Sequence, residues 1–266
     1  MLMLQRNAWI IGSVAGIGLA CAQAAFAAPG YYCDPALHGD TVVFTSEGDL
    51  WAGSIQGGLA RRLTSHLAEE SQAAISPDGT RVAFVASYDG APDVYVMPLA
   101  GGEPTRLSFD GGRVWLAGFS PQGEVVYASE NVIGPSLRRV LRAVDVAGRA
   151  TRQLPLADAR EAAFDPEGKA LWFTRYGLQV SGDNAQDYRG GAMAQLWRWS
   201  GNEAEEAQRI APDLDANLST PMWWNGRLYA VSDAGGRANL WSMASDGSER
   251  RALTTHRGFD VRGADM

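Results

Sequence analysis

The residues best suited to acid–base or metal chemistry are few, because the sequence holds only three histidines and two cysteines. A serine nucleophile needs a histidine base placed between its hydroxyl group and a carboxylate. His66 and His256 both follow a Leu-Thr pair, and His38 lies at an expected turn, so a repeating fold explains them better than catalysis does. No G-x-S-x-G motif occurs. We therefore expect no catalytic residue and no cofactor in this chain.

Acidic residues gather at Asp89–Asp93 and over 233–239, where oxygen ligands could in principle bind calcium. The alternating carboxylates of an EF-hand loop are missing from both segments. We expect these side chains to cap tight turns through local hydrogen bonds. A zinc site is also not expected from three scattered histidines and Cys33, the one cysteine outside the N-terminal segment.

Aromatic residues are the remaining candidates for binding. Trp51, Tyr95, Trp197 and Trp241 share one position of a repeat, which favours packing between repeats over carbohydrate binding. The pair Trp223-Trp224 differs, because neighbours on a strand face opposite sides. One of the two is expected in the core, and the other is expected to face a channel, a partner or a neighbouring module.

A polar, glycine-rich insertion over 175–194 carries Tyr176, Tyr188 and Arg189. Long loops often carry binding functions, although a solvated hairpin is the simpler alternative. The candidate partner or substrate surface therefore consists of Tyr176, Tyr188, Arg189, Trp223 and Trp224.

A repeat of about 44 residues must position these side chains. Each copy has four short apolar runs, which is typical of a four-stranded β-propeller blade. A glycine follows the first turn position of each copy, since a tight hairpin needs positive φ. These dipeptides are His38-Gly39, Asp78-Gly79, Gln122-Gly123, Glu167-Gly168 and Asn225-Gly226.

Further marks recur along each copy. The third strand is predicted from Leu50-Trp51, Val94-Tyr95, Ala143-Val144, Leu196-Trp197 and Leu240-Trp241, and the fourth from Leu63, Leu107, Leu154, Ile210 and Leu253. The predicted fold is an all-β propeller with five complete four-stranded blades of a six-bladed ring, incomplete at the C-terminus. The blades are predicted at 30–66, 67–110, 111–156, 157–212 and 213–256, with the start of a sixth at 257–266.

The N-terminus is predicted to be a signal peptide covering residues 1–27. Arg6 supplies the positive charge, Ala8–Ala20 is apolar, and Ala25–Ala27 forms an A-x-A cleavage site. A lipoprotein signal at Cys21 is the alternative. The domain is predicted at 28–266, in the periplasm or secreted, with no membrane contact after cleavage. The net charge of −7 disfavours nucleic acid as a partner.

The mature chain resembles the N-terminal propeller of tricorn protease and its bacterial homologues. The residues that carry the resemblance are Asp40–Trp51, Ser76–Leu107, Pro221–Arg227 and Asn239–Met243. The resemblance implies a six-bladed ring followed by a second propeller, a PDZ-like domain and serine-peptidase domains. None of the family's catalytic positions has a counterpart in this sequence.

The resemblance implies a non-catalytic propeller that guides peptides or unfolded chains toward a peptidase chamber in an exported serine peptidase. Its expected partners are that substrate and the downstream peptidase and PDZ-like modules. The alternative is a stand-alone periplasmic protein-binding propeller of the Tol-system type, and a prolyl-oligopeptidase-like propeller is a third interpretation. An open ring would leave unpaired strand edges, so self-association into homo-oligomers is also expected.

Overall fold

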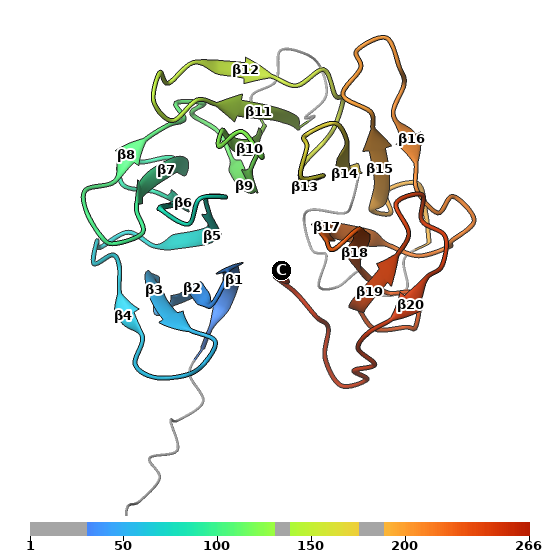
Figure 1. The fold of residues 1–266 in the computed structure, drawn as a ribbon, viewed down its shortest axis with the longest axis horizontal. Helices are drawn as coiled ribbons and strands as arrows, with labels where there is room; N and C mark the ends of the chain where they lie inside the picture. Colours follow the sequence, from blue (N-terminus) through green and yellow to red (C-terminus); the bar gives the residue numbers. More distant parts are fainter. Residues whose placement is uncertain (1–30, 131–138, 176–188) are drawn as a thin grey trace, which may run out of the picture. The chain divides into compact units, whose positions relative to one another are not determined.

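The computed structural model describes residues 31–130, 139–175 and 189–266, which form five antiparallel sheets of four strands, here called blades (Figure 1). Blade one contains β1 (Cys33–His38), β2 (Thr41–Ser46), β3 (Asp49–Ser54) and β4 (Arg61–Arg62). Blade two contains β5 (Glu70–Ile75), β6 (Arg81–Ala86), β7 (Asp93–Pro98) and β8 (Thr105–Arg106). Blade three contains β9 (Val114–Phe119), β10 (Val125–Ser129), β11 (Val140–Val144) and β12 (Thr151–Gln153).

Blade four contains β13 (Ala162–Phe164), β14 (Leu171–Arg175), β15 (Gln195–Trp199) and β16 (Gln208–Arg209). Blade five contains β17 (Leu218–Trp224), β18 (Arg227–Ser232), β19 (Asn239–Met243) and β20 (Arg251–Ala252). The prediction of an all-β propeller with five blades is therefore confirmed. The long connection between the second and third strands of blade four is also where it was expected.

The predicted first-turn glycines adopt the conformation for which glycine is suited. Their φ angles are all positive, between +56° and +84°: Gly39, Gly79, Gly123, Gly168 and Gly226. Side chains tolerate this region poorly because the Cβ atom crowds the carbonyl oxygen. Each glycine therefore permits the tight turn that joins the first strand of its blade to the second.

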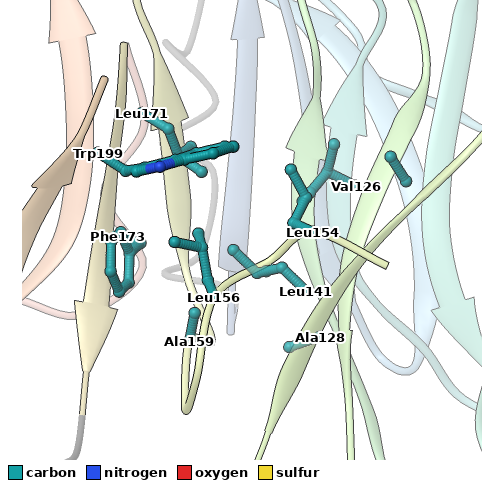
Figure 2. Packing of buried hydrophobic residues seen from close by; sticks show 10 residues of the cluster. Val126, Ala128, Leu141, Leu154, Leu156, Ala159, Leu171, Phe173 and Trp199 are labelled. Carbon is teal, nitrogen blue, oxygen red and sulfur yellow. The ribbon is translucent and has the colours of Figure 1, made fainter. Parts of the chain in front are cut away.

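Buried apolar clusters join each blade to the next one along the chain. Four such clusters connect blades one and two, two and three, three and four, and four and five. Figure 2 shows the cluster between blades three and four, where Val126, Leu141 and Leu154 face Leu171, Phe173 and Trp199. The core is thus divided into layers between sheets rather than gathered in one centre.

The third blade departs from the predicted register. The backbone N–H of Leu154 donates to the carbonyl of Leu141, as Leu63 does to Leu50 and Leu107 to Val94. Leu141-Arg142 therefore occupies the position that was predicted for Ala143-Val144, and Arg142 pairs with Gln153. Arg142 occupies the position at which the other blades carry an aromatic residue. The third strand of this blade was therefore predicted two residues too late. The Arg142 guanidinium lies 3.4 Å from the buried carboxylate of Asp110.

The acidic clusters have more than the predicted capping role. Asp93 is fully buried at the start of β7, where it pairs with Arg106 and accepts a 2.7 Å hydrogen bond from Ser108 Oγ. Ser108 Oγ in turn accepts the N–H of Val94. The Asp233 carboxylate accepts two hydrogen bonds of 2.8 Å from Asn217, one from its backbone N–H and one from its side-chain amide. Both carboxylates link separate segments, which local turn chemistry could not indicate.

The C-terminal segment after β20 forms no strand in the part of the chain that the structure describes, so a sixth blade is not seen. The segment nevertheless connects blade five to blade one. Val261 N–H donates to the carbonyl of Ala238 at 2.8 Å, and Asp265 Oδ2 accepts the N–H of Leu37 at 2.7 Å. Within the described residues, no helix has the length and hydrophobicity needed to cross a membrane.

Candidate functional site

The inner strands of all five blades line one cavity of about 680 Å³. These strands are β1, β5, β9, β13 and β17, each at the edge of its sheet. Residues 263–266 of the C-terminal segment complete the lining. Because each inner strand pairs with only one neighbour, its free edge borders this central space. The cavity has the size of a ligand site.

Polar side chains of the inner strands link neighbouring blades at one level of the cavity. Asp34 Oδ2 accepts the N–H of Gln72 at 3.1 Å, and Gln72 Oε1 accepts the N–H of Leu116 at 2.9 Å. In the same way, Glu161 Oε2 accepts the N–H of Thr220 at 2.8 Å. These five residues occupy one repeat position, and we call its three bonding side chains, Asp34, Gln72 and Glu161, the polar ring. These bonds link blade one to two, two to three, and four to five beside the cavity.

Glu161 is the most strongly held carboxylate of the polar ring. Burial opposes its ionisation, but the Arg160 guanidinium at 2.7 Å and hydrogen bonds from Thr174 Oγ1 and Thr220 N–H lower its pKa below the ordinary value. Each of these contacts stabilises the charged form. The ion pair therefore places one compensated negative charge beside the cavity.

A second level of the cavity is apolar. Its side chains occupy one repeat position near the end of each inner strand and are all half-buried: Leu37, Ile75, Phe119, Phe164 and Trp223. We call these five residues the apolar belt. Four of them, all but Leu37, also pack against a cluster between blades. Each blade therefore presents an apolar side chain to the cavity just before its first turn.

Trp223 and Trp224 take opposite roles. Trp223 lines the cavity and stacks on the buried Trp172, with ring centroids 4.3 Å apart and planes within 9°. Trp224 is 56% exposed, and among the described residues it is not part of the cavity wall. The indole nitrogen of Trp172 donates to the carbonyl of Ser245 at 2.9 Å, which holds the stack in place.

Among the candidate residues of the insertion, the structure describes only Arg189, which does not line the cavity. Tyr176 and Tyr188 lie outside the described residues. Arg189 pairs with Asp233 at 3.1 Å, and Asp233 also binds Asn217. Arg189 thus contacts the turn that follows β18.

The histidines have packing roles. The His66 ring lies 4.2 Å from that of Tyr88, and its Nδ1 accepts the N–H of Ala68. The His256 ring lies 4.3 Å from that of Phe259. His38 packs against the first turn of blade two, where a Cβ atom on Gly79 would come within 2.8 Å of its ring. Over residues 31–130, 139–175 and 189–266, no cluster of His, Cys, Asp and Glu suits a metal ion.

Sequence reasoning singled out Trp223, which lines the cavity, but not the other members of the belt or the polar ring. The signal was present in the repeat. When the copies are aligned on the first-turn glycine, an apolar residue precedes it by a few positions in every blade. Asp34, Gln72 and Glu161 had no such signal, because their role depends on a hydrogen bond to the next blade.

Comparisons with known proteins agree with this architecture. Residues 29–266 match the family described as "Tricorn protease N-terminal beta propeller domain". The chain is 33% identical over 248 residues to Tricorn protease homolog 1 of Streptomyces coelicolor, covering 90% of this chain and 22% of that protein. It thus spans about a fifth of the length of this curated relative.

Solved structures show the same fold. The crystal structure of the tricorn protease superposes with a TM-score of 0.78 at 23% identity, covering 90% of this chain and 24% of that one. A putative TolB from Agrobacterium tumefaciens superposes with a TM-score of 0.69 at 19% identity, covering 85% and 82%. The match to the family spans all the described residues and decides the assignment. The chain belongs to the tricorn protease N-terminal β-propeller family.

Proposed function

We propose that this chain is the non-catalytic, substrate-gating propeller of an exported tricorn-like serine peptidase. In this proposal its channel binds peptides or unfolded chains and guides them toward peptidase domains of a longer protein. The observation that carries the proposal is the cavity of about 680 Å³ bordered by the inner strands of all five blades. Family membership and the 22% share of the relative's length support it.

A binding assay tests this proposal. A fluorescently labelled, permanently unfolded polypeptide is titrated with the full chain, and anisotropy is recorded. Saturable binding that a folded competitor fails to displace is expected. The same chain should not cleave the labelled polypeptide. Absence of binding at all accessible concentrations would contradict the gating function.

Export is part of the same proposal, with cleavage after Ala27. Expression in a Gram-negative host, followed by N-terminal sequencing of the periplasmic fraction, should give a chain that begins at Ala28. A full-length chain retained with the cytoplasm would argue against it.

The proposed assembly is a six-bladed ring in which residues 261–266 take the place of a sixth inner strand. Asp34, Gln72 and Thr220, at the polar-ring position of three blades, have φ between +49° and +55°. Gly263 repeats this conformation with φ +58°, and its Cβ position lies 3.7 Å from Asp34 N. The shared φ and the closeness of Gly263 to blade one support this proposed place for the C-terminal segment.

A stand-alone protein-binding propeller is the second candidate, favoured by the TolB-like structure, of which this chain covers 82%. The reading frame that follows codon 266 separates the two candidates. Codons for PDZ-like and serine-peptidase domains support the peptidase. Their absence, together with capture of a periplasmic partner, would favour the second candidate.

A further inference from the structure

The cavity wall changes character between its two levels. The polar ring uses its side chains to bond the backbone of the next blade, so these groups are already engaged. The apolar belt carries no polar side chain except the indole N–H of Trp223. A ligand that reaches the belt therefore meets three aromatic and two aliphatic side chains, each half-buried.

Trp223 is the member of the belt that is held by stacking on a buried tryptophan. One face of its indole is covered by Trp172, which is itself 2% exposed and held by the hydrogen bond to Ser245. The Arg198 guanidinium lies 5.8 Å from the Trp172 ring. This support leaves Trp223 little freedom to rotate, and a rigid aromatic surface binds apolar groups at a low entropic cost.

We infer that the apolar belt selects extended peptides by their apolar and aromatic side chains. The inference rests on the proposed function of the channel and names the substrate class it takes. Free edges of inner strands can bond an extended backbone, which leaves side chains to determine specificity. A sugar is less suited to the belt, because the side chains of Asp34, Gln72 and Glu161 are engaged in bonds between blades.

Two labelled peptides of equal length and charge test this inference. One carries Phe and Leu at alternate positions, and the other carries Ser and Asn there. The full chain is expected to bind the apolar peptide about tenfold more tightly, the effect of one buried aromatic contact. A benzophenone side chain in place of one Phe should cross-link to the segments that contain Phe119, Phe164 or Trp223.

The substitution Trp223→Leu should reduce binding of the apolar peptide by about tenfold. Its matched control is Trp224→Leu, which alters the adjacent residue outside the cavity and should bind as the wild type does. If circular dichroism shows that Trp223→Leu does not fold, Phe164→Leu replaces it. Phe164 belongs to the same belt and lacks the stack on Trp172.

Equal binding of the two peptides, or cross-links confined to residues outside the belt, would overturn the inference that the belt selects apolar side chains. The proposed gating function would not be affected by that result. Failure of both peptides and of the unfolded polypeptide would overturn the proposed function as well. Unchanged affinity of a folded Trp223→Leu variant would show that the belt does not contact the ligand.

Discussion

At the scale of single residues, backbone conformation and contact with the neighbouring blade act together. Gly79 and Gly123 occupy equivalent turns with φ of +69° and +84°. Their surroundings differ, because a Cβ atom on Gly79 would lie 2.8 Å from the His38 ring, whereas nothing lies within 4 Å of one on Gly123. The pair therefore separates backbone strain from a steric clash.

We predict that Gly123→Ala costs about 1 kcal/mol of unfolding free energy, from positive φ alone. Gly79→Ala should cost more, since His38 must also move. The measurement is urea denaturation followed by circular dichroism. In the background of His38→Ala, the excess cost at Gly79 should disappear. Equal costs in the wild-type background would show that His38 does not pack on this turn.

Two glutamates, the buried Glu70 and the half-buried Glu161, should respond differently to loss of charge. Glu161 has its pKa lowered despite burial, by Arg160 and by hydrogen bonds from Thr174 and Thr220. Glu70 has its pKa raised, chiefly by burial, although Tyr88 OH and Thr64 Oγ1 donate to it at 2.7 and 2.9 Å. The folded state therefore favours the charged form of Glu161 and disfavours that of Glu70.

We predict that Glu161→Gln costs about 2 kcal/mol at pH 7, because the variant has no charge-assisted network at this position. Glu70→Gln should be close to neutral. A lowered pKa contributes stability above the unfolded value that is lost as pH falls through the folded one. The deficit of Glu161→Gln should therefore shrink when denaturation is repeated at acidic pH. A deficit independent of pH, or an equal cost for both variants, would contradict this assignment.

At the scale of the strand, the third strand of each blade places one residue toward the preceding blade and its neighbour toward the next. In blade four, Trp197 packs on the cluster shared with blade three, and Leu196 belongs to the cluster shared with blade five. Trp241 is the equivalent of Trp197 in blade five. The packing role predicted for these aromatic residues follows from this alternation.

We predict that Trp241→Ala costs about 3 kcal/mol, because the indole packs between blades and its removal leaves a cavity there. Trp241→Phe should cost less than about 1 kcal/mol, because the buried indole N–H finds no hydrogen-bond partner among the described residues. The control is Trp197→Phe, which removes an indole N–H that donates to Gln195 at 3.3 Å. Thermal melting of the three variants compares them, and equal destabilisation by both Phe variants would contradict the role of the unpaired N–H.

At the scale of the whole molecule, the described residues join successive blades by four apolar clusters, and none of these clusters joins blade five to blade one. Phe44 and Trp51, which pair across β2 and β3, lie on the face of blade one that points away from the cluster shared with blade two. Tyr32 is 60% exposed and meets Phe44 edge to face at 5.3 Å. This face is the one that a further blade or a second copy would cover.

We predict that the chain self-associates through this face. Sedimentation equilibrium should give an average mass that rises with protein concentration, since exposed apolar faces and strand edges recruit other chains. Tyr32→Ser should weaken the association, whereas Tyr31→Ser, at an 81% exposed neighbour, should not. A chain that stays monomeric throughout the concentration range would refute this prediction.

The repeat in the sequence was enough to predict five blades, the turn glycines and the layers between sheets, because each of these depends on residues close together in the chain. Positive φ at Gly39 or Gly226 is a local requirement, and the aliphatic marks Leu63, Leu107 and Leu154 pair with the strand just before them. Residue types and their spacing along the chain are therefore enough to predict these features.

Only the tertiary structure decided which side chains border the cavity. Glu161 bonds Thr220, and Gln72 bonds Leu116, across boundaries between blades that no local pattern encodes. The misplaced register of Arg142 has the same origin, since its partner Asp110 lies on the segment that precedes β9. Polar contacts between blades depend on how the sheets are placed around the axis, and that placement arises from the summed packing of all the layers.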